Sequence, residues 1–342
     1  MTGDADMTHF KVRPSMRPRS AVIIACSLVL LSACSVFGAE DGGYAGAPVQ
    51  WGIGARPVAM GGAYVAIAEG PSAFWWNPAG IAQIRVNGLE AAWRSMSFDR
   101  QAGYLALVHP FGKEDAAMSL GWIYAGVADL YEVSEDGRQG AALSNYTNAA
   151  TFTFARRFTP ALSLGVTLRY IQQNIANINA YTVGFDFGAH LRFVRDWYIG
   201  KARIPMSKVR LGAAVHSVGQ KYPWTTTKYW VGQGQSSGSS ASEKFPLIGR
   251  AGITTAWFGD RALISFDGEF NQKQSTRLHA GLEARPLASL ALRAGIDDSH
   301  PTFGAGVEPR LQSKLSLALD YAFATQPGAI DPEHLFSVGI RF

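Results

Sequence analysis

Hydrophobic and polar residues alternate along most of the chain after residue 88. The segment 161–171 (ALSLGVTLRYI) places five large apolar side chains on one face and small or polar residues on the other. The segments 314–324 (KLSLALDYAFA) and 181–193 repeat this alternation. Successive side chains of a β-strand point to opposite faces, so a period of two over this length predicts strands.

About fourteen such segments follow one another, separated by turn residues. They span 89–97, 102–109, 116–124, 149–158, 161–171, 180–193, 208–218, 246–257, 261–270, 276–284, 289–297, 302–310, 314–324 and 333–342. An even number of antiparallel strands closes a barrel without an open edge, as lipid requires of a spanning sheet. Residues 89–342 are therefore predicted to form an all-β, 14-stranded antiparallel transmembrane β-barrel.

The connectors between these segments alternate in length. Short turns such as Phe158-Thr159-Pro160 and Arg285-Pro286 follow every second segment, whereas the longest connectors, 125–147 and 219–245, follow the others. Outer-membrane barrels have short periplasmic turns and longer external loops. The connector 194–207 is the exception, and it is either an inward-folded turn or a sign that the assigned register is wrong there.

A soluble β-sandwich would also alternate. Two features favour a membrane barrel instead. Aromatic residues recur at segment ends, as in interfacial belts, at Trp93, Trp122, Phe158, Phe193, Trp257 and Phe270. The last segment ends on Phe342 and resembles the signal that the outer-membrane insertion machinery recognises. The expected location is the outer membrane of a Gram-negative (diderm) bacterium, with outer-membrane lipids and the insertion machinery as partners.

The composition agrees with this class. Charged residues make up 17% of the chain, against about a quarter in typical proteins, while glycine is abundant at 37 residues. No run of 18 apolar residues exists, so no transmembrane helix is expected. Residues 1–39 hold four Lys/Arg and two Asp, so removing them lowers the net charge from +5 to +3. That charge does not indicate a nucleic-acid partner.

The N-terminus has the features of an export signal. Arg17 and Arg19 precede the apolar run 21–31 (AVIIACSLVLL), which small residues follow. Cleavage near Gly38 or Ala39 is favoured over a lipoprotein-type cut before Cys34, because a barrel needs no lipid anchor. Residues 1–39 are thus predicted to be removed, leaving a periplasmic N-terminus. The same cut removes both cysteines of the chain, and with them any disulfide or cysteine ligand.

Residues 40–88 lie between the signal and the first predicted strand. Gly61-Gly62 permits a sharp bend or close backbone approach. Ser72 and Asn77, each next to a proline, are helix-start signals that predict short helical turns over 72–76 and 78–84. A barrel of this size leaves an open lumen unless a segment fills it. We predict that residues 40–88 form a hatch that plugs the barrel.

The order RPVAMGGAYVAIAEGPSAFWWNPAGIA resembles the N-terminal hatch of the PorV/PorQ family, relatives of the FadL-type outer-membrane transport barrels. The matching positions are Arg56, Met60, Gly61, Gly62, Ala63, Trp76, Asn77, Pro78, Ala79 and Gly80. The resemblance implies a FadL-like barrel whose Asn-Pro-Ala turn sits inside the wall. It also implies two functions, because relatives serve either the uptake of hydrophobic molecules or type IX secretion.

If the apolar faces meet lipid, the opposite faces line the lumen and carry charges of both signs. The predicted lumen polar network includes Arg169, Asp186, Arg192, Arg250, Asp267, Glu269, Arg293 and Asp320. We interpret it as a hydrogen-bonded scaffold that keeps the wall rigid and ties down the hatch. The alternative is a conductive path for a solute, although a mixed lining names no solute charge.

The connector 219–245 combines aromatic residues with a Gly/Ser stretch typical of flexible linkers. Its aromatic residues are Tyr222, Trp224, Tyr229 and Trp230. They form either an interfacial belt with a mobile tip or a contact surface for a hydrophobic ligand or a protein partner.

Catalytic and metal-binding motifs are not found. The chain contains no HExxH, CxxC, P-loop or G-x-S-x-G sequence. His190, His216 and His279 alternate with apolar neighbours and are interpreted as hydrogen-bonding lumen residues. Asp267 and Glu269 are interpreted as salt-bridged wall residues. No enzyme activity, cofactor or metal is therefore expected.

Two functional hypotheses remain. The first is a passage for hydrophobic small molecules across the outer membrane. The second is a non-transporting component of a type IX-like secretion complex or a surface-protein attachment complex.

Overall fold

The computed structural model describes residues 44–342, except 113–114, 177, 200–201, 233, 235, 310, 312–314 and 326–330. The predicted signal peptide, with Cys34, and the first four residues of the predicted hatch lie outside the described residues. Within the described part of the chain, no helix has the length and apolar character needed to cross a membrane.

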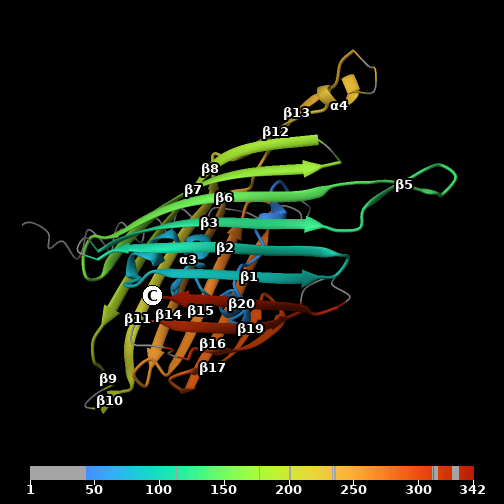
Figure 1. Cartoon of the computed structure of the whole chain (residues 1–342). Helices are drawn as coiled ribbons and strands as arrows, with labels where there is room; N and C mark the ends of the chain where they lie inside the picture. Colours follow the sequence, from blue (N-terminus) through green and yellow to red (C-terminus); the bar gives the residue numbers. More distant parts are fainter. Residues whose placement is uncertain are drawn as a thin grey trace, which may run out of the picture. The chain divides into compact units, whose positions relative to one another are not determined.

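Fourteen strands form one closed antiparallel barrel (Figure 1). They are β1 (Gly88–Met96), β2 (Arg100–Phe111), β3 (Ala116–Val127), β6 (Asn145–Arg157), β7 (Leu162–Ile175), β8 (Ile178–Val194), β11 (Met206–Val218), β14 (Ile248–Trp257), β15 (Ala262–Asn271), β16 (Gln274–Leu287), β17 (Leu290–Asp297), β18 (His300–Val307), β19 (Ser316–Ala324) and β20 (Glu333–Arg341). The first and last strands pair with each other and close the ring. The predicted 14-stranded barrel is confirmed.

The barrel wall is apolar outside and polar inside. On β7, Leu164 and Leu168 are each 41% exposed. Thr167 and Arg169, the residues on either side of Leu168, are buried. Phe185 and Phe187 on β8 are exposed, and Asp186 between them is buried. A soluble β-sandwich would bury its leucines and expose its charges, so this inversion excludes it and fits a wall surrounded by lipid.

Three connectors form small hairpins outside the ring. At one end, here called the long-loop end, lie β4 (Tyr131–Val133) with β5 (Gln139–Ala142), and β12 (Lys221–Thr225) with α4 (Thr227–Gly232) and β13 (Ser240–Lys244). At the opposite, C-terminal end, β9 (Trp197–Ile199) pairs with β10 (Ala202–Ile204). The unusually long connector 194–207 is therefore an exposed hairpin between correctly assigned strands.

One predicted turn is wrong. Arg285 and Pro286 belong to β16, which continues to Leu287 beyond a register irregularity, and the turn lies at 288–289. The irregularity accommodates the proline, which cannot donate a ladder hydrogen bond.

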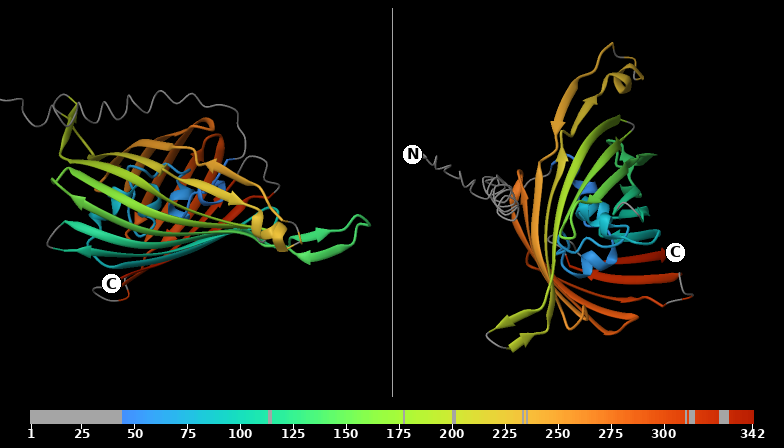
Figure 2. Two further views of the ribbon diagram at one scale, coloured as in Figure 1. Left: turned by 90° about the horizontal axis from the view of Figure 1, so that it is seen from above. Right: turned by 90° about the vertical axis from the view of Figure 1, so that its left-hand side faces the viewer.

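The segment before β1 lies inside the barrel (Figure 2). It contains η1 (Ala47–Val49), α2 (Ala55–Ala59), α3 (Ala73–Trp76) and η2 (Pro78–Gln83). The last two confirm the predicted helical turns. Asn77 caps η2 by accepting a hydrogen bond from the amide of Ala79, but Ser72 makes no capping hydrogen bond, contrary to the prediction. We call residues 44–87 the hatch.

The hatch enters at the long-loop end and leaves at the C-terminal end. Near its start, Gln50 donates a hydrogen bond to the hydroxyl of Ser217, at the end of β11 next to the long connector. At its other end, the carbonyl of Asn87 accepts a hydrogen bond from the amide of Phe342. The hatch therefore passes through the lumen along the barrel and joins β1 beside the closing pair of strands.

The outward face of the wall gives a test of membrane insertion. Leu168→Arg, halfway along β7, should lower the free energy of unfolding by about 2–4 kcal/mol, because its charge lies near the bilayer midplane. Phe158→Arg, at the strand end, should cost only about 0–1 kcal/mol. Denaturant titrations in lipid vesicles measure both, and equal costs at the two depths would contradict the predicted lipid contact.

Candidate functional site: the contact between hatch and wall

The hatch contacts the wall where glycines of neighbouring strands face each other. Gly281 pairs with Gly295, Gly212 with Gly252, and Gly165 with Gly188. A Cβ added at any of these six positions would overlap a residue of the hatch, and at Gly252 it would also overlap Asp267 of the wall. Each pair thus removes two side chains and lets the hatch lie directly against the strands.

Each glycine pair receives a different turn of the hatch. Met60 and Gly61 lie against the first pair, Val65 and Ala66 against the second, and the Asn77–Ala79 turn against the third. Gly61 and Gly62 both have positive φ, 64° and 77°, so the predicted close approach at these residues is present. Gly80 in turn packs against Ala68 within the hatch.

Asn77 is the most completely bonded residue of the hatch motif. Its side-chain nitrogen donates to the carbonyls of Val65, at 2.9 Å, and Ala189, at 3.0 Å. Its side-chain oxygen accepts from the amide of Ala79. The residue is fully buried. It therefore joins two parts of the hatch to β8 of the wall, with the Asn-Pro-Ala turn seated inside the barrel.

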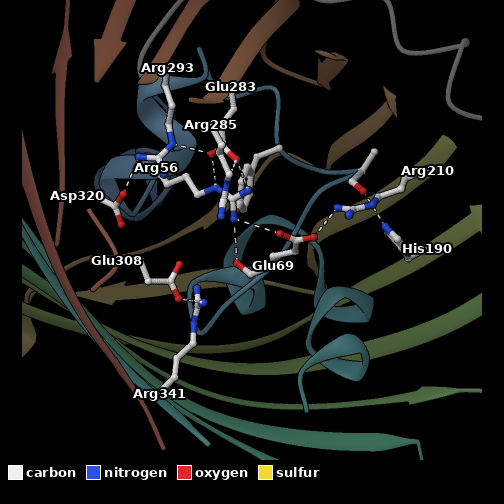
Figure 3. A network of polar contacts seen from close by, with 12 residues as sticks. Arg56, Glu69, His190, Arg210, Glu283, Arg285, Arg293, Glu308, Asp320 and Arg341 are labelled. Carbon is white, nitrogen blue, oxygen red and sulfur yellow. Dashed lines mark hydrogen bonds and ion pairs between the residues drawn. The ribbon is translucent and has the colours of Figure 1, made fainter. Parts of the chain in front are cut away.

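Arg56 provides the main charged link between hatch and wall (Figure 3). Its Nε and Nη2 donate to the two carboxylate oxygens of Glu283 at 2.8 and 3.0 Å, a bidentate pairing. The same carboxylate accepts from Arg285 at 3.0 Å and from Arg293 at 2.7 Å. Arg293 also donates to Asp320 at 2.6 Å. One buried acid on β16 thus holds three arginines.

Glu69 extends this network to β11, three strands away from β16 in the ring. It accepts from Arg56 at 3.2 Å and from Arg210 of β11 at 2.6 Å. Its role was not predicted, although it is the one acid in the apolar run 57–84. A single acidic residue in such an apolar run is costly to bury unless a basic residue pairs with it. The position of Glu69 in the sequence therefore predicts a basic partner, and the structure supplies Arg56 and Arg210.

The remaining residues of the predicted polar network fall into separate groups. Arg169 forms an ion pair with Asp186, which also accepts from the amide of Ser217. Asp267 accepts from the amide of Val65 in the hatch at 2.7 Å. Arg192 is half-buried and lies opposite Arg210 in the strand register, with no ion pair found among the described residues.

Arg250 links the wall to the hatch tryptophans. It pairs with Glu269 at 2.5 Å, and its guanidinium lies 4.6 and 5.0 Å from the ring centres of Trp75 and Trp76. The Trp76 indole donates to the carbonyl of Ile53 at 3.0 Å. A guanidinium over an aromatic face is a favourable cation–π contact, more so where water is excluded.

A polar chamber of about 350 Å³ lies beside these tryptophans at the long-loop end. Its lining includes Trp51, Trp76, Arg94, Arg277 and Asp297. Arg94 pairs with the buried carboxylate of Glu333, a residue that was not predicted to belong to the lumen network. We call this space the long-loop chamber.

The four aromatic residues of the 219–245 connector are not one surface. Tyr222 is 1% exposed and packs on Phe245 and Trp224 at the base of the hairpin. Burial raises the pKa of the Tyr222 hydroxyl, and the carboxylate of Glu243 raises it further. Tyr229 and Trp230 are 40% and 37% exposed near the tip. Of the four residues, Tyr229 and Trp230 are exposed, Trp224 is half-buried and Tyr222 is buried.

The C-terminal residue, Phe342, is half-exposed at the end of β20. Its side chain also borders a vestibule at the C-terminal end of the barrel. Among the described residues, no group of three or more histidine, cysteine, aspartate or glutamate side chains could hold a metal ion.

No family model and no curated protein matches the chain. Solved structures do. The CymD monoaromatic hydrocarbon channel covers 85% of this chain and 96% of its own length, and the toluene transporter TodX of Pseudomonas putida covers 90% and 98%. A FadL homologue of Pseudomonas aeruginosa covers 82% and 95%. Each has a TM-score of 0.53 and 14% sequence identity.

The chain has the fold of a FadL-like barrel. At this level of identity the similarity shows the fold alone and does not identify a solute.

A substitution at one of the paired glycines tests the contact between hatch and wall. Gly165→Ala should lower the free energy of unfolding by about 1–3 kcal/mol, because its methyl group overlaps the backbone of Pro78. It should also expose the hatch to trypsin. Gly249→Ala is the matched control, since a Cβ there meets no atom within 4 Å. Equal stability and equal cleavage of the two variants would show that the hatch does not press on the wall.

Proposed function

We propose that the protein is an outer-membrane passage for hydrophobic small molecules, with the long-loop end facing the exterior. In this orientation Tyr44, the first described residue of the hatch, lies at the exterior end, contrary to the predicted periplasmic N-terminus. The observation that carries this proposal is an apolar cluster that extends from the base of the external hairpin into the hatch. It includes Tyr222, Phe245, Val49, Trp75 and Phe74. A hydrophobic molecule captured outside would find successive apolar contacts along this cluster.

The exposed tip of the hairpin fits a capture role. Tyr229 and Trp230 pack edge to face, with ring centres 5.1 Å apart, and Trp224 lies between them and the buried Tyr222. Aromatic side chains present a large apolar area with little loss of conformational entropy. The names of the structurally similar proteins, a monoaromatic hydrocarbon channel and a toluene transporter, support a hydrophobic solute.

A second candidate is a secretion or surface-attachment component of the PorV/PorQ type. The resemblance of residues 56–80 to the hatch of that family favours it. In this role the barrel is a docking platform, and the exposed hairpins β4–β5 and β12–β13 would contact protein partners instead of solutes.

Uptake measurements separate the two candidates. Cells that lack the gene should lose uptake of labelled toluene or a labelled fatty acid, and the wild-type gene should restore it. The double variant Tyr229→Ser with Trp230→Ser should raise the apparent KM about tenfold, because two aromatic contacts together contribute about 1.4 kcal/mol. Tyr131→Ser on the β4–β5 hairpin is the control and should have no effect.

Unchanged uptake in the deletion strain, together with loss of surface proteins, would reject transport in favour of secretion. Co-purification from outer membranes, followed by mass spectrometry of bound lipids and proteins, would then identify the partners.

A further inference from the structure

Cavities follow one side of the barrel from end to end. The long-loop chamber lies at one end, and a vestibule of about 1250 Å³ lies at the C-terminal end. A small pocket between Arg56 and Arg293 lies between them. Residues of β16 line all three spaces: Arg277 and His279 line the chamber, and Arg285 lines both the pocket and the vestibule.

The helix α2 separates these spaces. Val58 borders the chamber, whereas Arg56, two residues earlier, borders the pocket. The helix contacts β17, β18, β19 and β20. The chamber and the vestibule are thus two ends of one path along the inner wall, interrupted by α2 and the Met60-Gly61 turn.

The attachment of α2 differs from that of the rest of the hatch. The other turns press their backbone on paired glycines. α2 meets a single glycine, Gly304 of β18, through the Cβ of Ala59, and its hydrogen bonds to the wall involve side chains. Arg56 pairs with Glu283, the Ser337 hydroxyl accepts from the amide of Ala55 at 2.8 Å, and the Thr302 hydroxyl donates to the carbonyl of Ala59 at 3.2 Å. The Arg56–Glu283 pair, here called the latch, is the one charged contact of this set.

Arginine dominates the lining below α2. Arg56, Arg85, Arg285, Arg293 and Arg341 border the pocket or the vestibule, against the carboxylates of Glu308 and Asp320. Each of these arginines has an acidic partner: Arg341 pairs with Glu308, Arg85 with Asp115, and the other three share Glu283. Glu283 lies beneath them and is fully buried. Rings of arginine or lysine select anions in pores.

We propose that the barrel contains a second, aqueous route: an anion-preferring pore along β16–β20 that the latch closes. This activity is separate from the passage of hydrophobic molecules, because a hydrocarbon in this space would desolvate charged groups without compensating them. The pore opens when Arg56 leaves Glu283 and α2 moves from the inner wall, while the glycine contacts of Val65 and of the Asn77 turn keep the hatch in the barrel.

Single-channel recording in planar bilayers tests this route. Arg56→Gln removes the latch but leaves Glu283 paired with Arg285 and Arg293, so no buried carboxylate is left without a partner. Its open probability should exceed that of wild type at least about tenfold, because the variant loses the bidentate pair of charge-assisted hydrogen bonds. In a potassium chloride gradient, its reversal potential should shift toward that of chloride. Arg203→Gln, which breaks an exposed ion pair on the β9–β10 hairpin, is the matched control.

A reversible lock tests the position of the gate. The double cysteine Ala59→Cys with Thr302→Cys, in an Arg56→Gln chain whose Cys26 and Cys34 are serine, ties α2 to β18. Oxidation should abolish the added conductance, and reduction should restore it.

Three results would overturn the inference. The first is a folded Arg56→Gln barrel, judged by heat-modifiable migration in electrophoresis, that conducts no more than wild type or the control. The second is conductance that persists after oxidation of the lock, and the third is a preference for potassium. Toluene uptake measured on the same variants reports on the proposed transport function independently, so that either conclusion can fail alone.

Discussion

The rest of the structure depends on one constraint, which is that a wall in contact with lipid must turn its polar side chains inward. Once the leucines and phenylalanines of the strands face the bilayer, arginines and acids of the alternate positions share a narrow lumen. Charged groups in such a space are stable only with partners. Some find them on the neighbouring strand, as Arg169 of β7 and Asp186 of β8 do, and others bind the hatch. The hatch therefore fills the lumen and also supplies ionic partners for charged side chains of the wall.

An apolar hatch in a polar lumen appears contradictory, and the glycine pairs resolve the contradiction. Where two facing glycines remove the side chains of the wall, the hatch meets neutral backbone, and its own carbonyls and amides lie against the strands. Where the wall keeps its charges, the hatch supplies Arg56 and Glu69. Contact by backbone fixes position closely, because it leaves no rotatable side chain between the two surfaces.

The sequence is sufficient to predict the wall, because the period-two pattern directly records which face each residue occupies. All fourteen strands follow from it, and only local details differ, such as the extension of β16 through Arg285 and Pro286. The pairing of Arg56 with Glu283 could not be predicted. These residues are 227 positions apart, and their contact depends on the stagger of the whole barrel. The burial of Tyr222 could not be predicted either, because it depends on a contact between residues distant in sequence. The alternating pattern of the strands does not indicate that the 219–245 hairpin packs on the start of the hatch. The isolated acid Glu69 did carry a usable signal.

The route of the hatch through the lumen constrains how the protein can be assembled. The contacts of α2 lie on the last strands to be synthesised, and its bond to Ser337 spans 282 positions. A chain that lacks its final strands therefore has a hatch without its binding surface, as well as an unpaired β1. Contacts of such high sequence separation form late. The seam between β1 and β20 lies beside the point where the hatch leaves the lumen, where the carbonyl of Asn87 accepts a hydrogen bond from the amide of Phe342. A truncated chain would expose both defects at once, an unpaired strand edge and a hatch without its binding surface.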